Sequence, residues 1–425
     1  MSSTSMEMNK APSAAEVGRN LGDTVKNTVA VALPKVEEGF TIKKAVRFES
    51  LGFLVVFFGF FVAMGMIMGG TNMINSLIAT AFDLLINTAF YVLAVAVLAG
   101  AIAEMLNEFG IISAANKFLS PIVKKVYGMP GACVVGMLTT YFSDNPAIIT
   151  FAENNQIRRL FKKYQLPALT NLGTCFGMGM VVSAVVIGIK SPIGESFAAP
   201  VLLGNVAAII GGIVSTRIML IFTAKKYGKE AMVELDGDFE DDGIDMDKYQ
   251  KTRDGSVASR VMSAAMDGGA SGVKIGMQTV PGILIFTTIV IMLTRGAGAD
   301  GTYTGAAYQG VAFLPTILSK IDFILKPLFG FSSVDALSVP LTAIGSGGAS
   351  ISLIPSLVDA GLANAHDIAV FTAMCMCWSG YLSTHVAMMD CLKERDLTGK
   401  AILAHTIGGI CAGVAANLLF TVLIH

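Results

Sequence analysis

The sequence predicts an all-α polytopic membrane protein built from inverted repeats, with two re-entrant helical hairpins and broken helices. Three observations predict this fold class. Hydrophobic residues make up 53% of the 425-residue chain and charged residues only 14%, whereas soluble domains carry about a quarter charged residues. Apolar runs of about 20 residues, long enough to cross a bilayer as a helix, recur along the chain. Two further apolar runs are interrupted midway by polar residues.

The first interrupted run covers 130–157 and is centred on Thr139–Ala147, which reads TTYFSDNPA. Each flank is too short to span a bilayer, so two half-length arms around a Pro-bearing tip indicate a re-entrant hairpin. Backbone that leaves helical form at membrane depth persists only where it lines an enclosed or watery cavity. Secondary transporters place ligands at such tips. The alternative is a buried turn in which Asp144 caps a helix.

The second half of the chain repeats the order of the first half. A shift of about 202 residues aligns Gly128 with Gly330 and Cys175 with Cys377. The second interrupted run, at 333–358, then corresponds to the first. Spans are expected at about 51–69, 77–105, 167–189, 197–222, 279–294, 366–391 and 401–424, interfacial helices at 108–127 and 309–327, and an amphipathic approach at 257–278.

The basic residues predict the orientation of these segments. Clusters at 158–163, 225–229 and 393–400 all fall on one side of the membrane, and Lys and Arg mark the cytoplasmic side. The N-terminus is therefore expected in the cytoplasm and the C-terminus outside, with the two halves inverted. The predicted segments are a cytoplasmic tail (1–50), a first membrane half (51–227) with the inner hairpin, an acidic cytoplasmic linker (228–260), and a second half (261–425) with the outer hairpin.

Two local patterns remain open to more than one interpretation. Gly173, Gly177 and Gly179 weaken the middle of 167–189, which indicates either a broken helix or a Gly-rich helix–helix contact. In the acidic linker, the spacing from Asp238 begins like a calcium loop. It fails at Tyr249, where the bidentate Glu belongs, so a solvated linker is preferred. The net charge of −1 does not indicate a nucleic-acid partner.

Asp144 is the leading candidate site residue, because a carboxylate at membrane depth is costly and is functional by default. It could bind a coupling Na⁺ or H⁺, or a substrate ammonium. Hydroxyl and carbonyl oxygens around the tip suit a hard cation. The predicted coupling-ion set is Ser143, Asp144, Thr174 and Ser183.

The predicted substrate site joins both tips to the spans that follow them. Ser346 and Gly347 offer backbone amides for close approach of an anion, although a simple tight turn is equally compatible. His385 could relay a proton or merely bond to a neighbour. The predicted substrate-binding set is Asp144, Asn145, Asn171, Thr174, Ser346, Gly347, Ser350, Trp378, Ser379, Tyr381 and His385.

A soft-metal site and an enzyme are the competing hypotheses. Cys375, Cys377 and His385 could ligate a metal. Residues two apart on a helix point about 200° away from each other, so both cysteines could face one ion only if the helix unwinds. No nucleophile–base spacing indicates an enzyme, and no cofactor is expected beyond the coupling ion.

The layout of 75–424 resembles the concentrative nucleoside transporters. The segments SDNPAI and GTCFGMGM resemble the bacterial YjiH-type membrane proteins with a nucleoside recognition (Gate) domain, a domain also found in ferrous iron transporters. The resemblance implies a multimeric elevator carrier with cation coupling in the bacterial inner membrane. Nucleoside carriers show a Gly-Gln-Thr-Glu-like sequence on the first hairpin, and Phe142–Pro146 departs from it. The fold is therefore implied, whereas nucleoside binding is not supported at the site.

We therefore expect a secondary active transporter of a small polar metabolite, such as a nucleoside-like compound, an amino acid or a short peptide. Its expected partners are membrane lipid, the small-molecule substrate and further copies of itself in a dimer or trimer. The alternative is a divalent metal ion permease related to the Gate domains of iron transporters.

Overall fold

The computed structural model describes residues 47–153, 155–235, 252–298 and 300–424. The regular secondary structure in these ranges consists of helices, which loops connect, and of one isolated bridge between Lys162 and Met232. Six helices among the described residues are long and apolar enough to cross a membrane. They are α2 (Phe48–Met68), α3–α4 (Gly70–Glu108), α9–α10 (Ala168–Gly188), α11 (Ala198–Tyr227), α12–α13 (Val257–Thr294) and the segment Arg395–Leu423, which contains α20 (Thr398–Leu423).

The chain forms two compact units, residues 1–61 and 62–425, and α2 crosses their boundary. Helix α2 exposes large apolar side chains such as Phe53 and Phe58, as expected of a helix that faces lipid. The repeats, the hairpins and the candidate site all belong to the second unit. The predicted tail up to residue 46 and the calcium-like spacing at 238–249 lie outside the described residues.

Both interrupted runs form helical hairpins. The first consists of α6 (Cys133–Phe142) and α7 (Pro146–Glu153), followed by the short α8 (Asn155–Arg158). The second consists of the 3₁₀ turn η3 (Val334–Leu337), α16 (Ser338–Ala343) and α17 (Gly347–Asp359). Each arm is too short to cross a bilayer. The two-hairpin prediction is confirmed.

The span that follows each hairpin is broken. The first divides into α9 (Ala168–Thr174) and α10 (Gly179–Gly188), and the second into α18 (Ala365–Trp378) and α19 (Tyr381–Cys391). The first break confirms the broken-helix interpretation of the Gly-rich segment. The predicted span at 366–391 is not one continuous helix, because the chain leaves helical form at Ser379 and Gly380.

The helices before each hairpin also match in order. In the first repeat α5 (Ile111–Val126) precedes the hairpin, and in the second α14 (Phe313–Leu318) and α15 (Asp322–Phe329) do. Helix α15 meets the η3–α16 segment at a bend of 77°. The predicted helix at 309–327 is therefore two helices rather than one.

Backbone geometry provides independent evidence for the repeat. A positive φ is an unusual backbone conformation. Three pairs of residues with positive φ are separated by the same shift of about 202 residues that aligns the two halves of the chain. The three pairs are Gly110 with Ala312, Gly128 with Gly330, and Met178 with Gly380. They mark the start of α5 and α14, the chain just before each hairpin, and the start of α10 and α19. The inverted-repeat prediction therefore rests on matched backbone conformation as well as on the order of elements.

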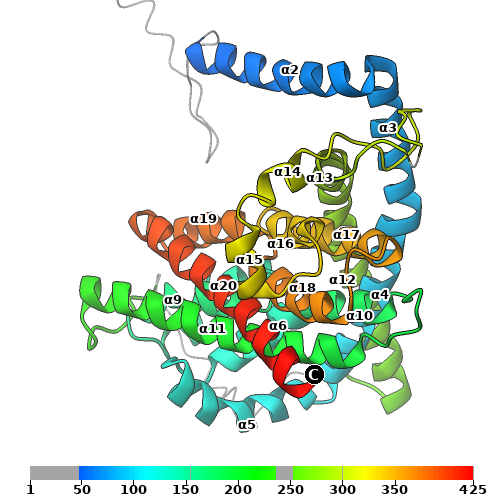
Figure 1. Ribbon diagram of the computed structural model, residues 1–425. Coiled ribbons are helices and arrows are strands. Elements are labelled where there is room, and N and C mark those ends of the chain that lie inside the picture. Colours follow the sequence, from blue (N-terminus) through cyan, green and yellow to red (C-terminus); the bar gives the residue numbers. More distant parts are fainter. Residues whose placement is uncertain (1–46, 154, 236–251, 299, 425) are drawn as a thin grey trace, which may run out of the picture. The chain divides into compact units, whose positions relative to one another are not determined.

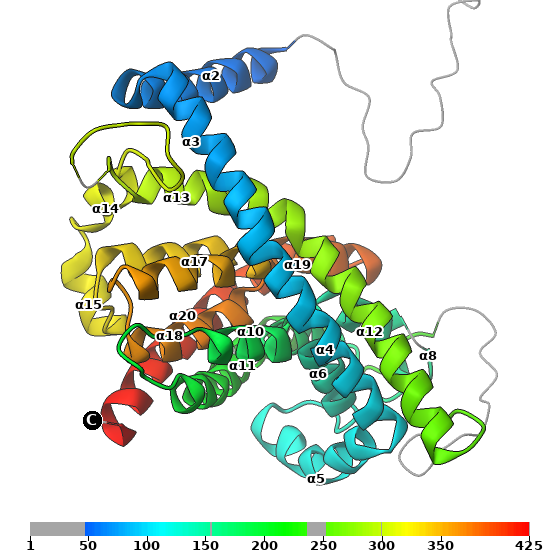
Figure 2. The ribbon, with the colours of Figure 1, turned by 90° about the vertical axis from the view of Figure 1, so that its right-hand side faces the viewer.

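The chain between 257 and 294 corrects one expectation. Instead of an amphipathic approach and a short span, it forms one continuous helix that includes a π-helical turn, η2 (Ile283–Thr287). This helix lies along α4, as Figure 2 shows. A Cβ on Gly268 would overlap the carbonyl oxygen of Gly100, so small residues let the two backbones pack closely.

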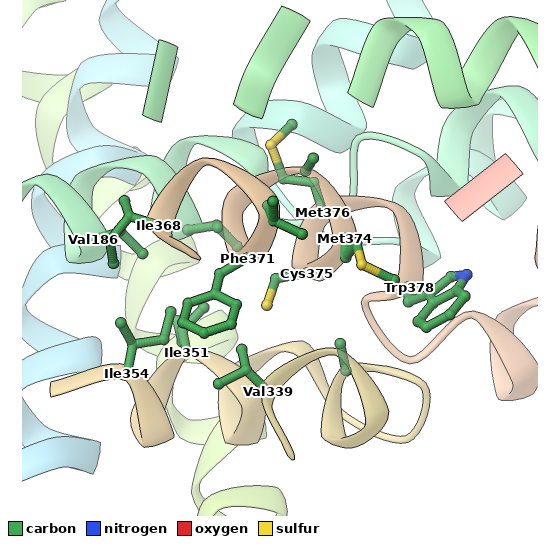
Figure 3. Packing of buried hydrophobic residues seen from close by; sticks show 14 of the residues in the cluster. Val186, Val339, Ile351, Ile354, Ile368, Phe371, Met374, Cys375, Met376 and Trp378 are labelled. Atoms are coloured by element: carbon green, nitrogen blue, oxygen red, sulfur yellow. The ribbon is translucent and has the colours of Figure 1, made fainter. Parts of the chain in front are cut away.

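The core is organised around α18, whose residues from Asp367 to Trp378 are all buried. It packs against α11 and α20 (Figure 1) and against the second hairpin. Figure 3 shows Phe371 and Cys375 pointing from α18 toward the hairpin, where Val339 and Ile351 lie. The second hairpin is thus fixed to the same helix whose end forms the second break.

Candidate functional site

Both hairpin tips meet at the break between α18 and α19. The Nδ2 of buried Asn145, on the first tip, donates to the carbonyl oxygen of Ser379. From the second hairpin, the carbonyl oxygen of Ala343 accepts from the amide of Gly380 at 2.8 Å. A Cβ on Gly347 would overlap the Ser379 hydroxyl. We call the meeting point of Ser143–Asn145, Gly347 and Ser379–Gly380 the tip junction.

The first break also reaches the tip junction. A Cβ on Gly177 would overlap the side-chain amide of Asn145, and one on Gly179 would overlap the ring of Tyr141. Glycine is therefore required here for close approach of the hairpin to the broken span. The hydroxyl groups of Tyr141 and Ser183 lie 3.5 Å apart. Four non-helical or helix-terminal segments, from both repeats, thus converge on one place.

Asp144 is half-buried at the tip, and its Oδ1 accepts a hydrogen bond from the amide of Asn145 at 2.7 Å. Among the described residues, no other hydrogen bond reaches the carboxylate of Asp144. This bond joins the Asp144 side chain to the backbone of the tip itself. The start of α7 is capped by the backbone of Asp144 rather than by its side chain, because the amide of Ala147 donates to the carbonyl oxygen of Asp144 at 3.0 Å. Within the described ranges, no donor reaches the second carboxylate oxygen.

A buried polar chain runs beside the tip junction and centres on His405 of α20. The Nε2 of His405 faces the carbonyl oxygen of Cys377 at 2.5 Å. Because a carbonyl only accepts, Nε2 carries the proton. Its Nδ1 then accepts from Ser215 at 3.1 Å, and Ser215 accepts from Asn171 at 3.0 Å. Neither His405 nor Ser215 is among the site residues predicted from the sequence, although a histidine within an apolar span is itself a signal of intramembrane function.

His385 lies against this chain but is only half satisfied. Its Nδ1 donates to the carbonyl oxygen of Tyr381 at 2.8 Å, as the neighbour-bonding alternative predicts. Its ring centroid is 4.6 Å from that of His405. Its Nε2 is buried and has no hydrogen-bond partner among the described residues. Tyr381 also lies beside His405, and its hydroxyl group is 2.6 Å from that of Thr406.

Unsatisfied polar atoms concentrate in the predicted site. Buried polar groups are nearly always hydrogen-bonded, so each exception needs an explanation. Four of the predicted substrate-binding residues carry a buried polar atom without a partner within the described ranges: Asn145 Oδ1, Asn171 Oδ1, Trp378 Nε1 and His385 Nε2. A polar solute or an ion is one way to satisfy such atoms.

Other predicted residues bond within their own helix or to a neighbouring helix. Ser346 caps α17 by accepting from the amide of Ala349 at 3.2 Å, and Ser350 donates to the carbonyl oxygen of Gly347 at 2.7 Å. Thr174 donates to the carbonyl oxygen of Thr170 at 2.7 Å and lies with His405 rather than with Asp144. Ser183 accepts from Asn205 at 2.9 Å. The predicted coupling-ion residues therefore divide into separate groups.

The proposed metal ligands are not brought together either. Cys375 points toward the second hairpin (Figure 3), whereas the Cys377 sulfur lies 3.8 Å from the carbonyl oxygen of Cys175 in the first break. Within the part of the chain that the structure describes, no group of three or more His, Cys, Asp or Glu side chains is placed to hold a metal ion.

No protein-family model matches the sequence, and no curated protein matches it. Solved structures of the concentrative nucleoside transporter CNTnw are similar in fold. A doubly substituted CNTnw in an outward-facing state matches with a TM-score of 0.51 and 16% identity, over 97% of this chain and 87% of that chain. CNTnw in an inward-facing substrate-bound state matches with a TM-score of 0.50 and 15% identity, over 96% of this chain and 87% of that chain.

These observations define the class of protein. The chain is an all-α polytopic membrane protein whose inverted repeats, hairpins and broken helices follow the concentrative-nucleoside-transporter-like fold. At this level of identity the similarity concerns the fold, and the chemistry must be argued from the residues of this chain.

Proposed function

We propose that the protein is a secondary active transporter that moves a small polar metabolite across the bacterial inner membrane by an elevator-type movement. The observation that carries this proposal is the tip junction, where two hairpins and two broken helices meet at the buried Asn145 Oδ1, which has no hydrogen-bond partner among the described residues. Trp378 Nε1 and His385 Nε2, on the helices that flank the second break, also lack a partner there. Discontinuous helices at membrane depth are the usual substrate and ion sites of secondary transporters. The fold similarity to a transporter known in outward- and inward-facing states supports the same function.

The proposed substrate is a nucleoside-like compound, an amino acid or a short peptide. Asn145 Oδ1 can accept from an amide or ammonium group, and His385 Nε2 can accept from a hydroxyl or amide group. Trp378 Nε1 supplies a donor. The departure of the first tip from the nucleoside carriers leaves the substrate class open within this group. Membership of the YjiH-type Gate-domain proteins is proposed on SDNPAI and GTCFGMGM alone.

The coupling ion is proposed to be Na⁺ or H⁺ at Asp144. The free carboxylate oxygen, with the hydroxyl of Ser143 beside it in the chain, suits either ion. The proposed topology has the N-terminus in the cytoplasm and the C-terminus outside, in keeping with the basic clusters. Assembly into a homodimer or homotrimer within the lipid bilayer belongs to the same proposal.

Uptake into proteoliposomes tests the proposal directly. Purified full-length protein would be offered labelled uridine, leucine, a dipeptide and Fe²⁺, each with and without an inward Na⁺ or H⁺ gradient. We expect one organic class to accumulate above its external concentration only when the gradient is present. Asp144→Asn should abolish the dependence on the gradient, whereas the exposed-site control Glu195→Gln should not. Accumulation of Fe²⁺ alone would favour the permease alternative, and accumulation of none would contradict the proposal.

A further inference from the structure

A cavity of about 580 Å³ lies away from the tip junction, between α17, the α3–α4 helix and the chain around Arg295 and Tyr308. Ligand sites in proteins commonly fall between about 300 and 1,000 Å³, so this volume suits an amino acid or a larger metabolite. Its apolar wall includes Val92, Val185 and Ile351. None of the residues that define the tip junction lines this cavity.

The wall on the α3–α4 side is not regular α-helix. Residues Leu84–Ala89 form the π-helical turn η1, which directly follows Asp83. Asn87 and Thr88 of this turn line the cavity, and so does Asp83. Short π-helical turns within α-helices occur frequently at functional sites because they redirect side chains. The helix is therefore irregular at the place where it supplies polar groups to the cavity.

The cavity holds charged groups of both signs that do not neutralise one another. Arg295 donates through Nη2 to the carbonyl oxygen of Ser356 at 2.8 Å, a main-chain contact at the end of α17. Asp359, on the same rim, makes no recorded hydrogen bond or ion pair among the described residues. Arg295 is half-buried and Asp359 is exposed at the rim, so a ligand that carries complementary charges can reach both groups from the cavity.

Asp83 is already engaged and plays a different part. It accepts from Asn87 at 2.8 Å and from the hydroxyl of Tyr308 at 2.5 Å. Burial, together with this hydrogen bond to Asp83, raises the pKa of Tyr308, so the phenol stays protonated. These contacts fix the π-helical turn against the chain around Tyr308. Among the described residues that line the cavity, Arg295 and Asp359 form no ion pair; Asp335, which does not line the cavity, is a nearby charge that interacts with Arg295.

We infer that this cavity is a second binding site, for a small zwitterion whose carboxylate pairs with Arg295 and whose ammonium pairs with Asp359. The inference does not depend on the chemistry of the tip junction. A solute held here by both charges would bind more tightly than an analogue that carries either charge alone, because each missing charge leaves one protein group unpaired.

Three ligands of the same skeleton test the inference on purified full-length protein by isothermal titration calorimetry. L-Phenylalanine carries both charges, 3-phenylpropionate lacks the ammonium, and 2-phenylethylamine lacks the carboxylate. We expect L-phenylalanine to bind at least about tenfold more tightly than either analogue, which corresponds to about 1.4 kcal/mol.

Substitutions then assign each charge. Arg295→Gln should weaken binding of L-phenylalanine and 3-phenylpropionate but not of 2-phenylethylamine, and Asp359→Asn should do the reverse for the two analogues. Arg295→Lys keeps the positive charge and should retain most of the binding of L-phenylalanine. Retained binding in this variant would show that the loss of binding in Arg295→Gln comes from the lost charge and not from misfolding. The exposed-site variant Glu195→Gln serves as the control and should bind all three as the wild type does.

Two outcomes would overturn the inference. One is equal binding of the three ligands or binding of none. The other is L-phenylalanine binding that survives both Arg295→Gln and Asp359→Asn. Asn145→Ala separates this site from the tip junction, because it should lower uptake on the order of 100-fold while leaving L-phenylalanine binding unchanged. Loss of both uptake and L-phenylalanine binding in Asn145→Ala would also overturn the inference, because the ligand would then bind at the tip junction.

Discussion

The two hairpins share one backbone plan and carry different chemistry. The first tip presents Asp144 and Asn145, whereas the second presents Ser346 and Gly347 without a charge. The first tip reaches into the other repeat, to the carbonyl oxygen of Ser379. The second hairpin instead contacts the break of its own repeat, through Ala343 and Gly380. The repeat therefore preserves geometry, while the side chains proposed for recognition and coupling are concentrated on one of its two copies.

The breaks differ in the same way. Met178 and Gly380 occupy equivalent left-handed positions, with φ of 53° and 59°. Glycine adopts this conformation at little cost, whereas a side chain costs roughly 1 kcal/mol or more. The first repeat therefore maintains a strained residue beside the polar tip, and strained backbone of this kind occurs at functional sites.

The largest expected effect comes from removing the contact that joins the repeats. Asn145→Ala leaves the carbonyl oxygen of Ser379 unsatisfied and removes the amide proposed to hold the solute. We expect uptake into proteoliposomes to fall on the order of 100-fold. Asn417→Ala is the matched control, because Asn417 also donates to a carbonyl oxygen, that of Leu328, at 2.9 Å. Equal uptake by both variants would contradict a special role for the first tip.

The second prediction separates the two neighbouring histidines. His405→Phe would remove the donor to the Cys377 carbonyl oxygen and the acceptor of the Ser215 hydroxyl proton, at a cost of about 3 kcal/mol. His385→Phe removes one bond and one unpartnered nitrogen, so its stability loss should stay below about 1 kcal/mol while uptake falls. Denaturant unfolding in detergent and uptake measure the two effects. A larger stability loss in His385→Phe would reverse the assignment of the structural and functional histidine.

The third prediction concerns the close approach of the second tip. Gly347→Ala places a Cβ on the Ser379 hydroxyl and should destabilise the protein by about 2 kcal/mol. Gly399→Ala in α20 meets open space and should be neutral or slightly stabilising. Thermal unfolding of both variants checks the difference. Equal stability would mean that the second tip is not tightly packed against the break.

The smallest expected effect is the loss of a helix cap. Ser346→Ala removes the hydroxyl that accepts from the amide of Ala349 and should cost about 1 kcal/mol without changing the ion dependence of uptake. Asp144→Asn, the equivalent change on the first tip, should abolish that dependence. A change of ion dependence in Ser346→Ala would show that the two tips share the coupling role.

The sequence alone determined the class of fold, the positions of both hairpins and the first helix break. These follow from local properties, because the length of an apolar run decides whether a helix can cross a bilayer, and glycine decides where a helix weakens. The same local rules misjudged 257–294, where an apparent amphipathic approach is part of one long helix. Its glycines pack against α4, and no local pattern reveals the partner of a small residue.

The tertiary structure alone decided which of the candidate residues belong together. Asn145 and Ser379 lie far apart in the chain, and His405 meets Ser215 only because α20 packs against α11. The cavity of Arg295 and Asp359 likewise joins segments from separate parts of the chain. Spacing along the sequence specifies a residue's place within its own helix, whereas contacts between helices depend on how whole helices pack. Which residues form the site therefore depends on how the two repeats pack against each other, and the sequence alone does not predict it.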